Sequence, residues 1–478
     1  MLAGVPEPDP RRWLALLTCC SALFMTLLDV SVTNVALPSI GHAMSAVPSE
    51  LQWVVSGYTL AFGLVPVLAG RLGDDHGRRL MFQVGVASFA GTSLLAGLAP
   101  SVSVLIAARV LQGLAGGLIN PQVSGLIQQL FRGHERGRAF GVLGTTVGLG
   151  TALGPLVGGA LIALGGQQVG WRLVFFVNVP IGVVVMLLAR RLLPSDVAVG
   201  RHRLDVLGAA LLGGATFGVL FASVQYRTLP GWLLGVLPVP VVVLLVLFFR
   251  RERRLTRLRR DPLVDLRLFR EPSYTTGSVL ALACFPALAG VPLVLTLYYQ
   301  QGLGYTALES GLAATAYAIG NGISAPLVGR VVTRVGRPLL VAATVTYGLG
   351  GVALAVLVDH APTAHVALVL APALFVMGAG AGAIVTPNQT LTLLSVDPAI
   401  GSTAGGVLQT AQRIGLAVGQ AVIGAAFFAG VGATGTTAQR YGDGLGTAIV
   451  VAVGFVVLAT AVGVTDVVRT RRRVRQAV

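Results

Sequence analysis

Long apolar stretches follow one another along nearly the whole chain, and short segments rich in glycine, proline and charge separate them. A helix of about 20 apolar residues crosses the ~30 Å hydrocarbon core of a bilayer. The pattern therefore predicts about fourteen membrane-spanning helices. Their expected positions are 13–36, 51–70, 80–98, 102–125, 138–164, 172–193, 205–224, 231–249, 275–299, 309–329, 338–358, 364–388, 402–429 and 445–467.

The composition agrees with a membrane protein, because 54% of the residues are hydrophobic and only 11% are charged, against about 25% charged in a soluble domain. The net charge of +16 is also compatible with nucleic acid or anionic lipid. However, the basic residues gather in loops on one side, as the positive-inside rule predicts. Only Arg172, Arg227 and Arg440 fall outside in this assignment, and Arg109 and Arg413 lie within spans. We therefore expect a multi-pass protein of a bacterial plasma membrane, with both termini cytoplasmic and no nucleic-acid partner.

The two ends of the chain repeat one another. The segment "GVLGTTVGLGTALGPLVGGA" (141–160) aligns without gaps on "GVLQTAQRIGLAVGQAVIGA" (406–425), and "GRLGDDHGRR" (70–79) has a weaker counterpart in "GRVVTRVGRP" (329–338). The repeat predicts an N-terminal six-helix bundle over 1–200 and a C-terminal one over 274–478, with two helices inserted at 201–273. Parallel halves with a path between them are typical of an alternating-access carrier. The expected fold class is therefore an all-α membrane protein that moves a small molecule.

One acidic residue lies deep in a predicted span. It is Asp29, in "LDVSVTNVALPSI" (28–40), and the other acids among the 18 lie nearer to span ends or in loops. Asp29 lies about 24 Å above the inner end of its helix and Arg109 about 12 Å below the outer end of its own, so both fall in the outer half of the membrane. Burial favours a neutral carboxyl group and a facing guanidinium favours a charged one, which predicts a site that loads and releases protons. The alternative is a static ion pair that only joins two helices.

Five motifs of the N-terminal half occur in an order that resembles a known family. They are "LDVSVTNVALP" (28–38), "GRLGDDHGRR" (70–79), "RVLQGLAGG" (109–117), "GLGTALGPLVGG" (148–159) and "WRLVFFVNVPIG" (171–182). In these motifs the chain is similar to the fourteen-helix drug:proton antiporters of the EmrB/QacA type, within the major facilitator superfamily. The resemblance covers nearly the whole chain and departs at Asp75, where the family's loop usually has a basic residue. It implies a major facilitator fold and proton-coupled efflux of amphipathic small molecules, and no enzyme activity.

The loop motif at 70–79 predicts a gate at the cytoplasmic face, made of Gly70, Gly73, Asp74, Gly77 and Arg78. The glycines permit a tight turn between two spans. Asp74 is expected to face the N-terminal end of the helix that starts near Ser402, because the first amides of a helix lack partners and carry partial positive charge. The alternative is a solvated turn that follows the positive-inside rule, which explains the arginines but not the acid.

The predicted span 138–164 contains a cluster of small residues and one proline, namely Gly150, Gly154, Pro155, Gly158 and Gly159. Small residues let helices approach closely, and proline permits a bend. Physical reasoning supports two interpretations equally: a seam that limits leak and favours exchange, or ordinary helix packing. The resemblance implies the first, as the motif of an antiporter.

The substrate contacts expected from the sequence are polar residues within spans: Asn34, Gln112, Gln409, Arg413 and Gln420. The last three form one polar stripe at helical spacing, which suggests a cavity wall. For Arg413 an architectural role is an equal alternative. The aromatic residues expected to offer apolar contact to a substrate are Phe285, Tyr298 and Tyr299.

Nothing in the chain resembles the lysine loop of an ATPase, so we expect the proton gradient to drive transport, with no cofactor and no metal. The cysteines, Cys19, Cys20 and Cys284, lie in apolar segments without the spacing of metal ligands. An importer or facilitator with the same fold is the main alternative function. A membrane receptor or assembly component that transports nothing is a third. We expect the protein to act as a monomer in the bilayer, with protons and a small molecule as its partners.

Overall fold

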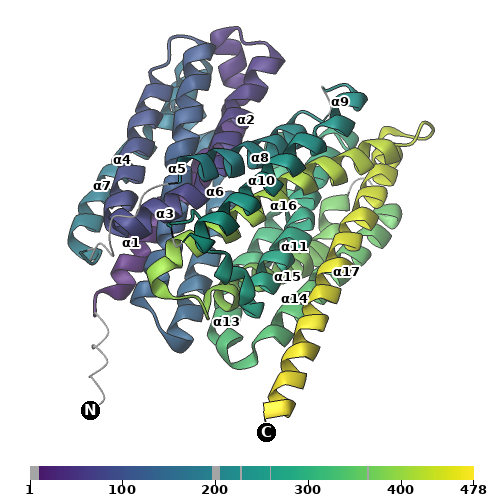
Figure 1. Cartoon of the computed structure of the whole chain (residues 1–478). Coiled ribbons are helices and arrows are strands. Elements are labelled where there is room, and N and C mark those ends of the chain that lie inside the picture. Colours follow the sequence, from purple (N-terminus) through teal and green to yellow (C-terminus); the bar gives the residue numbers. More distant parts are fainter. Residues whose placement is uncertain (1–9, 196–204, 227–228, 259, 363–364, 478) are drawn as a thin grey trace.

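The computed structural model describes residues 10–195, 205–226, 229–258, 260–362 and 365–477, which form helices and no strand (Figure 1). The helices are α1 (Arg12–Met44), α2 (Pro48–Leu64), α3 (Pro66–His76), α4 (Arg78–Gly97), α5 (Val102–Leu130), α6 (Gly133–Phe176), α7 (Asn178–Leu192), α8 (Val206–Val224), α9 (Gly231–Val236), α10 (Pro238–Arg257), η1 (Leu266–Arg270), α11 (Pro272–Leu297), η2 (Tyr298–Gly302), α12 (Ala307–Ala313), α13 (Thr315–Val335), α14 (Arg337–His360), α15 (Val366–Leu393), η4 (Pro398–Ile400), α16 (Gly401–Gly430) and α17 (Thr437–Ala477).

Helix α1 begins and α17 ends at the same end of the bundle, which we call the termini end (Figure 1). Among the described residues, 11 helices are long and apolar enough to cross a membrane, or 12 if the bent pair α2 and α3 is one span. The predicted boundary at residue 200 and the predicted outer arginine Arg227 lie outside the described residues.

Proline and glycine break several of the predicted spans. The predicted span 51–70 is two helices, α2 and α3, which meet at an angle of 47°. Pro66 begins α3, where its missing N–H costs no helical hydrogen bond. The predicted spans 138–164 and 172–193 are joined through α6, whose backbone turns at Gly166 with φ +69°, a conformation that glycine adopts without steric cost. The turn between α3 and α4 similarly relies on Gly77, with φ +105°.

The repeat in the sequence corresponds to a repeat in packing. Helix α6 lies against α1, and a Cβ added to Gly150 would be 2.9 Å from Cβ of Leu27. The matching Gly415 of α16 faces α11, where the added Cβ would be 3.0 Å from Cβ of Phe285. Each half therefore uses the same glycine position to bring its first and fifth predicted spans together.

The two halves approach each other closely near the termini end. A Cβ added to Gly70 of α3 would lie 2.3 Å from the Ser402 carbonyl oxygen of α16, and one added to Gly137 of α6 would lie 2.6 Å from the Gly329 carbonyl oxygen of α13. The second span of each half thus contacts the fifth span of the other, which keeps this end of the bundle closed.

The two helices predicted as an insertion lie on the outside of the bundle. Helix α8 packs on α2 and α16 through Leu60, Leu220 and Ala417. Helix α10 packs on α8 and continues from the short α9, so that the predicted span 231–249 is one span made of both helices. Only 6% of the apolar window of this span is buried by protein, as expected for a helix that faces lipid.

Candidate functional site

The carboxylate of Asp29 lies inside the N-terminal half, enclosed by α1, α4, α5 and α7. Asp29 is 1% exposed, and Arg109 of α5 is equally buried. The Arg109 Nη1 atom lies 2.5 Å from Asp29 Oδ2. The contact between these two residues predicted from the sequence is therefore present, and it joins α1 to α5.

Arg109 is held by further partners besides Asp29. Its Nε donates to the backbone carbonyl of Val54 over 3.2 Å, and its Nη1 also donates to Gln112 Oε1 over 2.8 Å. The guanidinium carbon lies 4.3 Å from the centre of the Tyr58 ring, a cation–π distance. Arg109 thus connects the Asp29 carboxylate to α2 as well as to α5.

The second carboxylate oxygen of Asp29 accepts two neutral donors. Gln112 Nε2 donates over 2.9 Å and Asn178 Nδ2 over 2.8 Å. Asn178 also donates to Ser93 Oγ over 2.9 Å, which ties α4 and α7 to the site. Gln112 is fully buried and its amide group bonds to Asp29 and Arg109, so that its expected contact with substrate stays a prediction.

The sequence reasoning missed Asn178, Ser93 and Tyr58. Asn178 is an amide within the apolar run "VFFVNVPIG" (174–182), which is a detectable signal because buried amides require partners. The network supplies one guanidinium and two amide donors to one carboxylate, and such donors stabilise its charged form. Protonation of Asp29 would remove that charge and weaken each of these bonds between helices.

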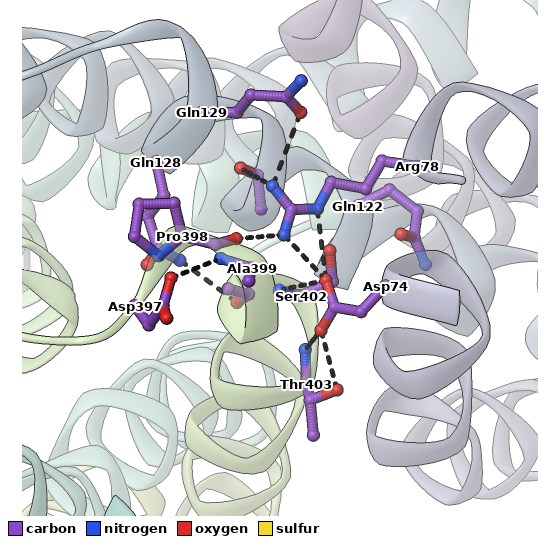
Figure 2. A network of polar contacts seen from close by, with 12 residues as sticks. Asp74, Arg78, Gln122, Gln128, Gln129, Asp397, Pro398, Ala399, Ser402 and Thr403 are labelled. Carbon is purple, nitrogen blue, oxygen red and sulfur yellow. Dashed lines mark hydrogen bonds and ion pairs between the residues drawn. The ribbon is translucent and has the colours of Figure 1, made fainter. Parts of the chain in front are cut away.

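The predicted gate residues gather where α3, α5 and α16 meet (Figure 2). Asp74 accepts from the backbone amides of Ser402, over 3.1 Å, and of Thr403, over 2.8 Å, and from Thr403 Oγ1 over 2.8 Å. The carboxylate therefore caps the N-terminal end of α16, where partial positive charge and unpaired amides favour an anion. This is the contact predicted from the sequence, and it crosses from one half to the other.

Arg78 fixes the Asp74 carboxylate from the other side (Figure 2). Its Nη2 lies 2.8 Å from Asp74 Oδ1, its Nη1 donates to the Gly125 carbonyl over 2.9 Å, and it also donates to the Pro398 carbonyl before α16. Gly73 leaves room for the Gln122 side chain, whose Oε1 would be 1.8 Å from an added Cβ. Glycine at this position lets α3 and α5 approach closely enough to place Asp74.

A second contact between the halves was not predicted. Arg136, near the start of α6, is 6% exposed and donates to the carbonyls of Leu393 and Leu394 over 3.4 and 3.3 Å. These carbonyls end α15, where the helix carries partial negative charge. An acid at a helix N-terminus and a base at a helix C-terminus thus hold the termini end closed.

Three of the four glycines of the 150–159 motif face α1. A Cβ added to Gly154 would lie 2.0 Å from Ser31 Oγ, and one added to Gly158 would lie 3.0 Å from Cγ1 of Val32; Gly150 faces Leu27. Nothing lies within 4 Å of a Cβ at Gly159, which therefore does not belong to this contact. The close-packed seam lies within one half and runs beside Asp29.

The residues expected to contact substrate separate in space. Gln409 donates across the halves to the Asn120 carbonyl over 3.2 Å and to Ser124 Oγ over 3.1 Å. The Arg413 guanidinium carbon lies 4.2 Å from the centre of the Phe62 ring, also across the halves. Asn34 and Gln420 are exposed.

The aromatic residues expected to contact substrate lie elsewhere. Phe285, Tyr298 and Tyr299 are buried, and their contact with a substrate stays a prediction. The ring of Tyr299 stacks on Tyr305 with 5.6 Å between the ring centres and lies 5.8 Å from the ring of Tyr298, within the C-terminal half.

Comparisons with known proteins agree with the fold. A sequence model of the Major Facilitator Superfamily matches residues 19–206 and 202–420. The probable actinorhodin transporter of Streptomyces coelicolor is 37% identical over 437 residues, which cover 91% of this chain and 75% of that protein. The puromycin resistance protein pur8 of Streptomyces alboniger is 34% identical, with 88% and 83% of the two chains covered. The crystal structure of the human organic anion transporter MFSD10 has the same fold, with a TM-score of 0.66, 16% identity, and 96% and 100% of the two chains covered.

Proposed function

The chain belongs to the Major Facilitator Superfamily, and we propose that it exports amphipathic small molecules from a bacterial cell in exchange for protons, with both termini in the cytoplasm. The observation that carries this proposal is the enclosed Asp29 carboxylate with its guanidinium and two amide donors. An ionisable side chain inside a membrane protein is costly and marks an ion pathway more often than a structural contact.

The network supports a route from proton binding to movement. When Asp29 is charged, it holds α1 to α5 through Arg109 and Gln112, and to α7 through Asn178. A proton on Asp29 neutralises the carboxylate and weakens all of these bonds, which lets α1 and its glycine seam with α6 move. The released Arg109 would stay held by Val54 and Tyr58, ready to favour loss of the proton again.

The contacts at the termini end supply the second element of an alternating-access cycle. Asp74 on the N-terminus of α16 and Arg136 on the C-terminus of α15 both join the halves. In the proposed orientation this end is cytoplasmic, so that these bonds must break before substrate enters from the cell. A discrete set of bonds that is either made or broken is what a two-state carrier needs.

Two further features support the finer assignment. Helix α13 and the part of α6 before Gly166 are not among the 12 spans counted above, and they contact each other across the halves. If these 2 helices also cross the membrane, the total is the fourteen of the proposed subfamily. The bacterial relatives named above transport or confer resistance to antibiotics, which favours export over import. We further propose that the monomer suffices and that no ATP is consumed.

The test uses inverted membrane vesicles with an imposed acid interior. Substrate added outside should drive protons out and make the lumen more alkaline, because an exporter of this kind exchanges the two. A symporter would instead carry protons inward with the substrate and acidify the lumen. A facilitator or a receptor would change the lumen pH in neither direction, and either result would contradict the proposal.

A further inference from the structure

A basic pocket lies at the termini end, away from the path between the halves. The end of α10 and the short helix η1 form an open surface pocket with a volume of about 780 Å³. Four arginines and two phenylalanines line it, namely Arg253, Arg257, Arg267, Arg270, Phe249 and Phe269. Cavities of about 300–1,000 Å³ hold small molecules, and none of the described residues that line this one is acidic.

The four guanidinium groups have no ion pair or hydrogen bond within the described part of the chain. Two of the nearby acids are engaged elsewhere: Glu252 accepts from the Val264 amide, and Asp265 accepts from the Arg267 amide. Asp205 pairs with Arg251 over 2.6 Å, outside the pocket. The pocket is therefore lined by four arginines that form no ion pair among the described residues, and by two aromatic rings.

An apolar stripe on α10 leads into this pocket. Val239, Val242, Val246 and Phe249 follow helical spacing, and Arg253 and Arg257 continue the same face. These four apolar side chains belong to a membrane span, and 61%, 57%, 43% and 40% of their surface is not covered by protein. One face of α10 thus offers an apolar surface for acyl chains, followed at the membrane surface by cations for a headgroup.

We propose that this pocket binds the phosphodiester headgroup of an anionic phospholipid, whose acyl chains lie along the stripe from Val239 to Phe249. Paired guanidinium groups bind phosphate oxygens strongly, and basic pockets at the end of membrane helices suit anionic headgroups. A zwitterionic headgroup would bring its own cation against four arginines. The site thereby anchors the inserted helices α8 and α10 to lipids of one charge class.

The chain offers a matched control on the same helix. Arg250 and Arg254 are exposed and lie on the neighbouring face of α10, below the apolar Val243 and Leu247. They do not line the pocket. Replacing either pair with glutamine removes the same charge at nearly the same depth, so that only the pocket differs.

The test measures binding of a fluorescent short-chain phosphatidylglycerol to the purified full chain in neutral detergent. The double variant Arg253→Gln and Arg257→Gln should bind this lipid about thirtyfold more weakly. The control double variant Arg250→Gln and Arg254→Gln should bind it less than about threefold more weakly. Phosphatidylcholine should not displace the fluorescent lipid from the unchanged chain. Equal losses in the two double variants would show that the helix end, not the pocket, attracts lipid. If the soluble headgroup glycerophosphoglycerol competes as well as the lipid, the ligand is a water-soluble phosphodiester and the lipid assignment is wrong.

Discussion

Asp29 and Arg109 form a buried ion pair with 2.5 Å between carboxylate oxygen and guanidinium nitrogen, and both residues belong to the N-terminal half. The position that matches Arg109 in the second half is Leu374, which is fully buried and apolar. The two halves therefore share a packing scheme but not this charge pair. Under the proposed function, proton coupling is a property of one half, and the other half follows through the contacts at the termini end.

Replacing Arg109 with alanine should move the pH optimum of transport upward. The change removes the positive charge that contacts the Asp29 carboxylate, and a nearby positive charge favours the charged form of a carboxyl group. The measurement is the pH dependence of substrate uptake into inverted vesicles. Arg337→Ala is the control, because Arg337 lies 3.0 Å from the carboxylate of Asp466, another largely buried acid, in the other half. A retained activity with an unchanged pH profile in Arg109→Ala would contradict the coupling.

Replacing Asp74 with asparagine should open the termini end. The change removes the charge that caps α16 and pairs with Arg78, and breaking a buried pair of this kind costs about 3 kcal/mol or more. The ratio of closed to open molecules should fall about a hundredfold. Spin labels at His134 and Arg334, exposed on opposite halves, should report longer distances.

The control for this gate is Asp397→Asn, because Asp397 lies in the same corner of the structure but caps η4 within its own half (Figure 2). It should leave the distance distribution as in the unchanged chain. Equal distributions in Asp74→Asn and Asp397→Asn would show that Asp74 does not hold the halves together.

Replacing Gly154 with valine should destabilise the protein and slow transport, whereas Gly159→Val should do neither. The added side chain at Gly154 meets Ser31 of α1 at 2.0 Å, and the one at Gly159 meets nothing within 4 Å. Overpacking of this kind costs about 1–3 kcal/mol. Melting temperatures of the purified variants in one detergent provide the comparison. If both variants melt like the unchanged chain, the seam between α1 and α6 is not closely packed.

Dicationic compounds should be poor substrates. Asp29 already neutralises Arg109, and the Arg413 guanidinium has no ion pair among the described residues. Each positive charge of a substrate about 6 Å from Arg413 costs about 3 kcal/mol at an effective dielectric of about 20. Resistance to matched mono- and dicationic dyes, in a host without its own exporters, should therefore be greater for the monocations. Arg413→Gln should reduce the difference in resistance between monocations and dications, whereas the control Arg440→Gln should leave it unchanged. Stronger protection against the dications by the unchanged chain would contradict the prediction.

The sequence predicted the parts of this site that one residue reveals by itself. A lone acid in an apolar run identified Asp29, and an acid beside arginines in a loop identified Asp74 and its helix partner near Ser402. It missed Arg136, because this residue is one of three arginines in a loop, with Arg132 and Arg138, and the residue type does not reveal its partner. It did not reveal that Asn178 and Gln112 serve Asp29, because a buried amide that serves a carboxylate has the same sequence signal as one that lines a cavity.

The positions where helices break were also predicted only in part. The composition of the span 51–70 does not show that Pro66 starts a new helix at an angle of 47°, since a proline inside a membrane helix is often tolerated. The repeat between the two halves has a counterpart in the packing, because Gly150 and its match Gly415 both face the first span of their own half, and a close approach of two helices requires small residues.

The central claim, that Asp29 carries the exchanged proton, is tested most directly by proton-driven accumulation of substrate in inverted vesicles containing Asp29→Asn. Asp466→Asn, which removes a buried carboxylate paired with Arg337 in the other half, controls for the loss of an ion pair. With equal amounts of protein in the membrane, Asp29→Asn should equilibrate substrate down its own gradient but should not accumulate it when a proton gradient is imposed, whereas Asp466→Asn should accumulate it. Accumulation by Asp29→Asn at the rate of the unchanged chain would contradict the claim.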